Sequence, residues 1–511
     1  MSTAAHGPLL GRIAADATPG VNERARVRIP YDLRDRVRRN QYVTIADARS
    51  PGLVFLGRLI TGPFFPSPEE SSDIVADVEI QGELDGNQTY DTNNRPAPES
   101  AVYELGPAEV RELLGLHGDM VLGCLSGWPE IGLSLQSHNK DVLPRNVGIF
   151  GTVGSGKSNS VQVIIEEASA RGWAIVLLDL EAEYVYMDQP TSQETLARAL
   201  PKFGREPRGL PDFHVYHPVS CTSDRPESQP FTLRIADFEP SVTAELLQCT
   251  LAERNALFDC IDYLQQKYQP RMTTTDSERL TELFDPAPAK PPYTLQLLKA
   301  RATERSPRNS ESMDYVGLAS KLQQLVHSGA FDQPNMRGLD PAEMLQPGRV
   351  NVIDVSIAND NVKNLVTADL LRKAFAYKIA REKAPPTLLV IEEAHSFMSR
   401  ERAHTMHATL QMLRNVTRRG RKRWLALAFV SQQPGHLPPE IFELCNTRIV
   451  HTLRSMHNLD ALMATTGDIT RELWSRCPLL GTGEAIISSP QFHRAVVARI
   501  RPAASNRRFT R

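Results

Sequence analysis

Short runs of β-branched and apolar residues, separated by Gly, Pro, Asp and Asn, fill the N-terminal stretch from residue 9 to residue 84. They read "LLGRIAAD", "ARVRIP", "QYVTIADA", "LVFLGRLI" and "DIVADVEI". Strands at such close spacing predict a small barrel or sandwich. The polar, turn-rich segment 85–100 is expected to be a surface loop of the same domain, which we place at residues 1–115.

A second pattern begins near residue 145, where long apolar runs alternate with helical periodicity. The runs are "WAIVLLDLE", "RVNVIDVS", "PTLLVIEE", "WLALAFVSQ" and "TRIVHTL". Near-continuous apolar runs are typical of strands that are buried on both faces of a parallel sheet. Residues 116–239 and 331–490 are therefore predicted to form an α/β core with a parallel-rich sheet.

The stretch between the two parts of this core, residues 240–330, has the pattern of helices. Apolar residues recur there at helical spacing, at Leu247, Leu251, Phe258, Ile261 and Leu264 and again at Tyr315, Leu318, Leu322 and Leu325. We predict a helical insertion at this place. Residues 491–511 are expected to add a last strand and a polar, basic tail.

Composition limits the classes of protein that fit. The 511 residues are too many for one hydrophobic core and predict two or three domains. A formal net charge of −2 is no sign of a nucleic-acid binder, so DNA contact would need a local patch or a ring of subunits. Six widely spaced cysteines favour reduced thiols over disulfides or a zinc site. With no basic, apolar leader and no run long enough to span a bilayer, we expect a cytoplasmic protein without a membrane partner.

The segment "GIFGTVGSGKSNS" at residues 148–160 carries the strongest chemical signal. It satisfies G-x-x-x-x-G-K-[ST], with an apolar strand before it and a helix after it, and this context argues against a chance Gly/Ser match. Such a loop aims backbone N–H groups at phosphate oxygens, while its lysine reaches the β- and γ-phosphates and its serine binds Mg²⁺. We therefore expect ATP and Mg²⁺ at Gly151, Thr152, Val153, Gly154, Ser155, Gly156, Lys157, Ser158 and Asn159.

Two adjacent glutamates, Glu392 and Glu393, end the apolar run "TLLVIEEAH". Hydrolysis needs a held metal and a water aimed at the γ-phosphate, so we predict that Glu392 holds the magnesium hydration shell and Glu393 polarises the water. Solvated glutamates that open a helix are the alternative. His395, His404 and His407 match no zinc spacing and are expected at the surface or behind the site.

The next apolar run ends in "AFVSQQP", where Gln432 or Gln433 is a candidate to sense the γ-phosphate, with turn capping as the alternative. Just before it, "NVTRRGRKRW" holds five cations within six residues. A basic run at a helix C-terminus usually balances the helix dipole. A P-loop enzyme also uses an arginine at the transferring phosphate, often from a neighbouring subunit, and Arg421 is our first candidate and Arg419 our second.

The phosphate loop, the glutamate pair and the glutamine turn follow one another along the chain in the order typical of one family. The chain resembles the HerA-like branch of the FtsK/HerA superfamily of hexameric DNA translocases. The resemblance covers nearly the whole length, from a barrel like the HerA barrel domain to a closing hairpin, "GEAIISSPQFHRAVVARI". It includes an Asp-x-x-x-Glu-Tyr pattern at Asp179, Glu183 and Tyr184, with "LLVIEEAH" as Walker B and "GRKRWLALAFVSQQP" as the finger-and-sensor strand. The expected fold is a RecA-like P-loop NTPase core with a helical insertion and a small N-terminal β-barrel.

The resemblance implies roles for single residues. Lys157 and Ser158 would take the triphosphate and the metal, Glu393 would be the catalytic carboxylate, Gln432 the sensor, and Arg421 a finger that acts in the neighbouring subunit. The family also implies a homo-hexameric ring that threads double-stranded DNA and works with a partner nuclease or another effector, including antiphage defence partners.

Two further segments have open interpretations. Arg400 and Arg402, just beyond Walker B, are candidates for pore-lining cations, with exposed helix decoration as the alternative. In related proteins a tail such as "RPAASNRRFTR" braces the next subunit, and a frayed terminus is equally compatible with its composition.

The main hypothesis is an ATP-driven, ring-forming DNA translocase or helicase that serves DNA end processing or antiphage defence. Two departures from the family pattern, Glu392 in place of an aspartate and Gln433 in place of an arginine, motivate an alternative. In that alternative the chain is a nucleotide-dependent ring scaffold that assembles and regulates a partner effector with little translocation. A peptide-remodelling ATPase is a third hypothesis, which DNA-binding measurements would separate.

Overall fold

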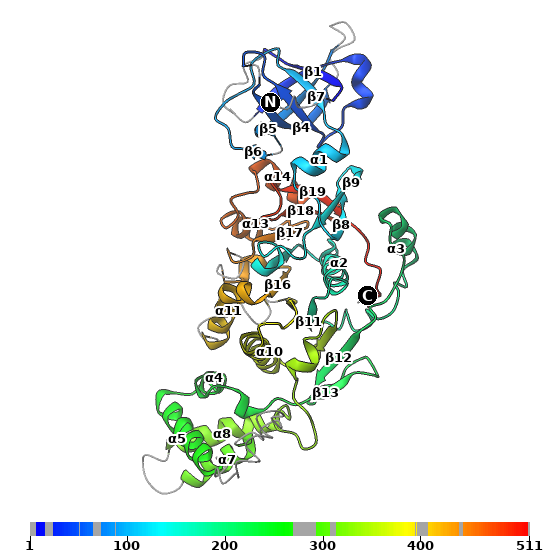
Figure 1. Cartoon of the computed structure of the whole chain (residues 1–511). Helices are drawn as coiled ribbons and strands as arrows, with labels where there is room; N and C mark the ends of the chain where they lie inside the picture. Colours follow the sequence, from blue (N-terminus) through cyan, green and yellow to red (C-terminus); the bar gives the residue numbers. More distant parts are fainter. Residues whose placement is uncertain are drawn as a thin grey trace.

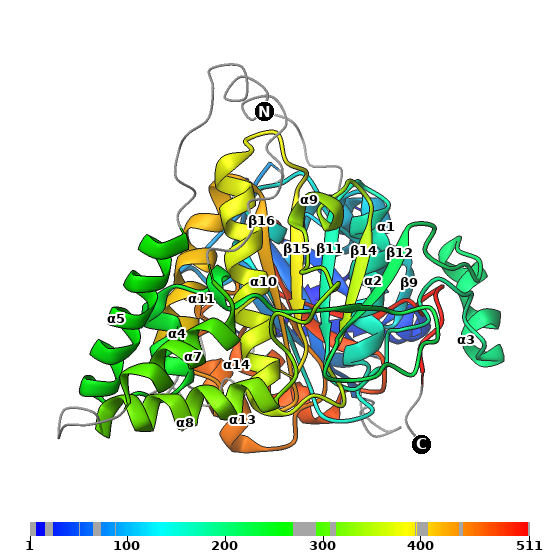
Figure 2. The ribbon, with the colours of Figure 1, turned by 90° about the horizontal axis from the view of Figure 1, so that it is seen from below.

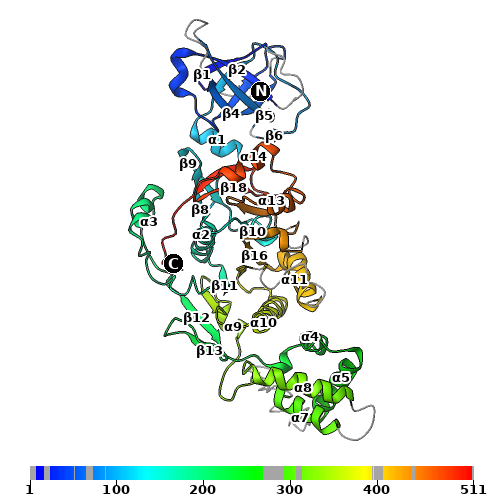
Figure 3. The ribbon, with the colours of Figure 1, turned by 180° about the vertical axis from the view of Figure 1, so that it is seen from behind.

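The computed structural model describes residues 7–15, 24–50, 52–64, 73–86, 88–268, 293–306, 313–393, 395, 407–438 and 443–508. Along its length a barrel, a central sheet with its helices, and a helical bundle follow one another (Figure 1). The view from behind shows the same order (Figure 3).

The N-terminal strands close into the small barrel that the sequence predicts. Six of them follow the order β2–β1–β7–β3–β4–β5, and β5 pairs back onto β2, while β6 pairs with β5 outside the ring. Alternate side chains fill the interior, as Val27 and Ile29 do between more exposed arginines in β2. The strands are β1 (Leu9–Ile13), β2 (Arg24–Pro30), β3 (Tyr42–Ala46), β4 (Val54–Phe64), β5 (Asp73–Asp85), β6 (Gln88–Tyr90) and β7 (Ala101–Glu104).

A twelve-stranded mixed sheet forms the α/β core. Its first eight strands are parallel: β13 (Gln229–Phe231), β12 (Phe213–Pro218), β14 (Val350–Asp354), β11 (Ala174–Asp179), β15 (Thr387–Ile391), β16 (Leu425–Ser431), β10 (Val147–Phe150) and β17 (Thr447–Val450). Four antiparallel strands continue it: β18 (Glu484–Ser488), β19 (Val496–Ile500), β8 (Met120–Leu125) and β9 (Trp128–Leu135). The five apolar runs predicted as buried strands are thus confirmed in the parallel part.

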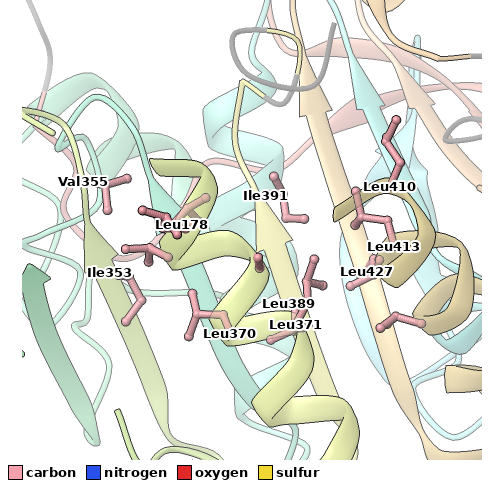
Figure 4. Packing of buried hydrophobic residues seen from close by; sticks show 14 of the residues in the cluster. Leu178, Ile353, Val355, Leu370, Leu371, Leu389, Ile391, Leu410, Leu413 and Leu427 are labelled. Carbon is pink, nitrogen blue, oxygen red and sulfur yellow. The ribbon is translucent and has the colours of Figure 1, made fainter. Parts of the chain in front are cut away.

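Helices cover both faces of the parallel strands, because alternate residues of each strand point to opposite sides. Leu178 and Leu389 pack against Leu370 and Leu371 of α10 (Asp360–Ala380), and Leu427 lies beside α11 (His407–Arg419), as Figure 4 shows. On the other face, α2 (Lys157–Ser169) buries its apolar residues in a second cluster. The sheet is therefore buried on both sides, as its apolar strands predict.

The remaining helices lie at the ends of this core. Helix α1 (Pro107–Leu113) follows the barrel, and α3 (Glu194–Ala199) continues into the 3₁₀ helix η3 (Leu200–Phe203), across the C-terminal tail from α2. Within 240–330, α4 (Pro240–Leu246), α5 (Leu251–Tyr268), α7 (Leu295–Arg305) and α8 (Met313–His327) form a bundle at the end away from the barrel (Figures 1 and 2). Short helices α9 (Pro341–Met344), α13 (Met456–Met463) and α14 (Arg471–Arg476) complete the set used below. Across the described ranges, none of the helices combines the length and apolar character that crossing a membrane requires.

Candidate nucleotide site

The glycine-rich loop joins strand β10 to helix α2 at the carboxyl edge of the parallel strands. Gly156 has a φ of +118°, which glycine adopts at low steric cost. Gly151 lies so close to His451 that a Cβ atom there would be 2.6 Å from the histidine Cβ. Since α2 begins at Lys157, its first backbone N–H groups have no partner inside the helix and are available to an anion.

Lys157 is buried, with 6% of its surface exposed, and its Nζ donates a hydrogen bond to the Thr152 carbonyl oxygen at 3.1 Å. Burial lowers the pKa of the lysine, and the carboxylates of Glu393 and Glu392 oppose that shift. The loop therefore holds a cation next to the end of β15, where the two glutamates lie.

Glu392 follows β15 and is almost fully buried, at 4% exposure. Its Oε1 accepts a hydrogen bond of 2.6 Å from the Tyr184 hydroxyl, and its buried Oε2 has no hydrogen-bond partner among the described residues. Burial, with the negative charges of Asp179 and Glu183 next, raises the pKa of Glu392 well above the ordinary value. This orphaned oxygen is a ligand position that a hydrated cation would satisfy.

Glu393 is held from two sides. Its φ is +41°, and its Oε1 accepts a hydrogen bond of 2.6 Å from the Gln432 amide, while His395 Nδ1 lies 3.1 Å from Oε2. Burial alone would raise the pKa of Glu393, but the bonds from His395 and Gln432 and the charge of Lys157 lower it. Neighbouring strands β15 and β16 bring these groups together, because their carboxyl ends meet at one edge.

The last residue of β11, Asp179, supplies another carboxyl group at this edge of the sheet. Asp179 is fully buried and accepts backbone N–H bonds from Glu181, Glu183 and Tyr184 at 2.9–3.2 Å. Burial, with Asp354 next in the same direction, raises the pKa of Asp179 to about 7 against the effect of those N–H groups. Asp179 thus shapes the turn that carries Tyr184 to Glu392.

These groups share one cleft of about 1120 Å³. Its lining includes Val153, Gly154, Gly156, Lys157, Ser158 and Asn159 of the loop, together with Glu181, Glu183, Glu392, Glu393 and Gln432. Six of the nine expected loop residues therefore line the cleft with both Walker B glutamates, whereas Gly151, Thr152 and Ser155 are not part of its lining. The Asn159 side chain has a further role, because it hydrogen bonds the backbone of residues 501 and 503.

The two glutamines of the sensor turn differ. Gln432 reaches Glu393, whereas the Gln433 side chain is exposed and its backbone N–H donates to Ser431 Oγ at 3.0 Å. The alternatives left open by the sequence are thus separated: Gln432 faces the site, and Gln433 does not.

Arg421 lies far from this cleft. It belongs to the 3₁₀ helix η8 (Gly420–Arg423), before the amino end of β16, and forms an ion pair with Asp141. The seven residues of β16 separate it from the phosphate loop by about 23 Å, at about 3.3 Å per residue. Arg419 ends α11 and is exposed. Arg400 and Arg402, the candidate pore cations, lie outside the described residues.

Two contributors to the site carry no recognisable sequence signal. His451, fully buried below the loop, lies 2.8 Å from Ser160 Oγ through Nε2 and 2.8 Å from the Glu484 carbonyl oxygen through Nδ1. Burial lowers its pKa to about 4, which keeps the ring neutral. The tail is the other contributor: residues 501–508 run along α2 of their own chain, so a frayed terminus is wrong for this part.

The comparisons with known proteins agree with this geometry. The family model described as the central domain of helicase HerA matches residues 123–374. The DNA double-strand break repair helicase HerA of Pyrococcus furiosus is 22% identical over 456 residues, which cover 82% of this chain and 76% of the relative. The HerA of Saccharolobus solfataricus is 23% identical over 389 residues, or 74% and 68% of the two chains. The chain is thus HerA-like, since it is similar to HerA helicases over about four fifths of its length.

The fold of this HerA-like ATPase also matches a solved structure. VirB4 of Thermoanaerobacter pseudethanolicus superposes with a TM-score of 0.52 at 17% identity, over 75% of this chain and 96% of that one. The phosphate loop of the HerA-like ATPase thus lies in an architecture that a distant protein shares.

The donor set of this HerA-like ATPase fits a magnesium ion bound together with a nucleotide. Within the described part of the chain, no group of three or more His, Cys, Asp or Glu residues forms a complete metal cage. Mg²⁺ at phosphate sites usually keeps several waters and takes one or two side chains plus phosphate oxygens. Ser158 and Glu392 line the cleft, and the hydroxyl of Ser158 and the unpartnered Oε2 of Glu392 are oxygen ligands of that kind.

Proposed function

We propose that this HerA-like ATPase is an ATP-driven DNA translocase or helicase that works as a homo-hexameric ring on double-stranded DNA. The observation that carries the proposal is Glu393, held by Gln432 at 2.6 Å beside Lys157 in one cleft. The names of the relatives, DNA double-strand break repair helicases, support DNA as the polymer.

In the proposed mechanism, loop residues 151–159 cradle the triphosphate and Lys157 neutralises the β- and γ-phosphates. Ser158 and Glu392 would hold Mg²⁺, which supplies charge neutralisation at the phosphates when bound. Glu393, ionised and oriented by Gln432 and His395, accepts a hydrogen bond from the attacking water. The strand order β17–β10–β16–β15–β11, in which β16 separates the phosphate loop from Walker B, supports a RecA-like core.

Arg421 would act on the nucleotide of a neighbouring subunit and not on that of its own chain. Because it lies about 23 Å from the loop of its own chain, at the opposite edge of the sheet, it would reach a phosphate of the neighbouring subunit. Its ion pair with Asp141 would hold it there. A ring, in which each site is completed by the next protomer, would bring Arg421 to that phosphate, and a partner nuclease or defence effector would dock on that ring.

Steady-state ATP hydrolysis of the purified chain tests the proposal. We expect Mg²⁺-dependent hydrolysis that double-stranded DNA stimulates, and Lys157→Ala should abolish it because the lysine charge at the phosphates is lost. Lys383→Ala, which removes an exposed lysine outside the cleft, is the matched control and should retain most of the activity. Hydrolysis that ignores DNA would contradict translocation and favour the ring scaffold.

A further inference from the structure

The nucleotide cleft also has apolar lining residues outside the phosphate loop, which we call its second end. Leu196 and Ala199 of α3 and Phe203 of η3 line one side, and Ile500 and Pro502 at the start of the tail also line the cleft. Figures 1 and 3 both place the tail between α2 and α3. The triphosphate would not bind to these apolar side chains, since phosphate oxygens bind hydrogen-bond donors and cations.

The tail side of this end is fixed. The Asn159 side chain donates to the Arg501 carbonyl oxygen at 2.8 Å and accepts from the Ala503 N–H at 2.9 Å. Further along, Glu166 accepts bonds of 2.7–2.8 Å from Ala504 and Ser505. Pro502 is therefore held against the first turns of α2, directly beside the loop that would bind the phosphates.

On the other side of the cleft, the segment formed by α3 and η3 is held in place by one buried residue, while its other side chains stay at least partly exposed. Leu200, between α3 and η3, is fully buried and fixes the segment. Every residue of α3 itself is described, and each is at least partly exposed, including Leu196 and Ala199, and Phe203 is half-buried. An anchored segment that presents partly exposed apolar side chains to a cleft leaves a face that a flat apolar ligand would cover.

We propose that this second end binds the base of the nucleotide, with Phe203 and Leu196 on one side of the ring and Pro502 on the other. The proposal rests on the proposed function, since phosphates at Lys157 would direct the rest of the ligand into the same cleft. A base ring stacks on aromatic and apolar side chains through its π-face, whichever base it is. Gln193 and Lys202, from the same segment, supply polar groups for the base edge or the ribose. The ligand is thus a nucleoside triphosphate, recognised at both ends.

Titration calorimetry with the full chain and Mg²⁺ tests this assignment by comparing ATP with inorganic tripolyphosphate, which has the phosphates but no base. Phe203→Ala should weaken ATP binding by about tenfold, at the lower end of what loss of one stacking residue causes, and leave tripolyphosphate binding unchanged. Phe203→Tyr keeps the ring and should retain the ATP affinity. Arg198→Ala, on the exposed surface of α3, is the matched control and should change neither.

Several results would overturn the assignment. One is unchanged ATP binding in Phe203→Ala; another is an equal loss for ATP and tripolyphosphate, which would mean that the substitution disturbs the phosphate end. Altered ring assembly with ATP affinity retained would assign α3 to a subunit contact instead. If the unsubstituted chain bound neither ligand, the proposed function itself would fail, so the two failures are distinguishable.

Discussion

Replacing Gln432 with alanine removes the 2.6 Å side-chain bond that orients Glu393. Hydrogen bonds to charged groups contribute about 1.5–3 kcal/mol. If all of that free energy orients the carboxylate in the transition state, kcat falls by about 10- to 150-fold. Glu393 keeps its contact with His395 and a long bond of 3.4 Å from the Gln432 backbone N–H, which alanine preserves. We therefore expect a loss near the lower end, about tenfold.

The assay is steady-state ATP hydrolysis beside a separate measurement of nucleotide Kd. Since Gln432 acts on Glu393 and not on the phosphates, kcat should fall while Kd stays within about twofold. Gln433→Ala is the matched control, because that side chain is exposed one position away. An equal loss of kcat in the control, or a raised Kd with unchanged kcat, would refute the orienting role.

The tail gives two predictions about stability. Arg501→Ala removes the partner that buried Glu166 and Glu167 share at 2.9 Å. Because Glu167 keeps Arg171 and Arg205 at 2.8 Å, the free energy of unfolding should fall by about 3 kcal/mol, at the low end for a broken buried pair, seen as a lower melting temperature. The exposed control Arg508→Ala should stay within about 0.5 kcal/mol, and equal effects would contradict the argument. Burial alone would raise the pKa of Glu167, but the charges of Arg501 and Arg171 lower it in the folded chain. Ionised Glu167 therefore stabilises the fold fully at pH values above the ordinary carboxyl pKa of about 4.3. This stabilisation is lost as the pH falls through the lower pKa that Glu167 has in the folded chain. Melting curves at falling pH should show this loss in the unsubstituted chain and a smaller one in Arg501→Ala.

The phosphate end of the site follows from local sequence patterns. A continuous apolar run predicts a buried strand, and in a parallel sheet the residue after each strand lies at the same edge. Glu393 after β15, Gln432 after β16 and Lys157 after β10 are therefore expected near one another, and the structure brings them together in one cleft. What the runs do not determine is which strands are neighbours: β16 lies between β15 and β10 although it follows both in sequence.

The base end could not be predicted, because it depends on contacts between distant parts of the chain. Glu166 and Glu167 are in the run "VIIEEA" and look like the solvated face of α2, yet both are buried. Their partners are Arg501 and the backbone of residues 504 and 505, more than 300 positions away. The polar tail gives no periodic pattern that would indicate such a position.

The charges around the phosphate end indicate how a nucleotide must enter it. Glu181, Glu183, Glu392 and Glu393 all line the cleft that holds Lys157. A bare polyphosphate would bring further negative charge next to four carboxyl groups, where partial burial weakens solvent screening. Burial and like charges already raise the pKa values of Glu181 and Glu392. A divalent cation that arrives with the phosphates would remove this repulsion, so we expect the nucleotide to bind as its metal complex and to bind weakly after the metal is removed with a chelator.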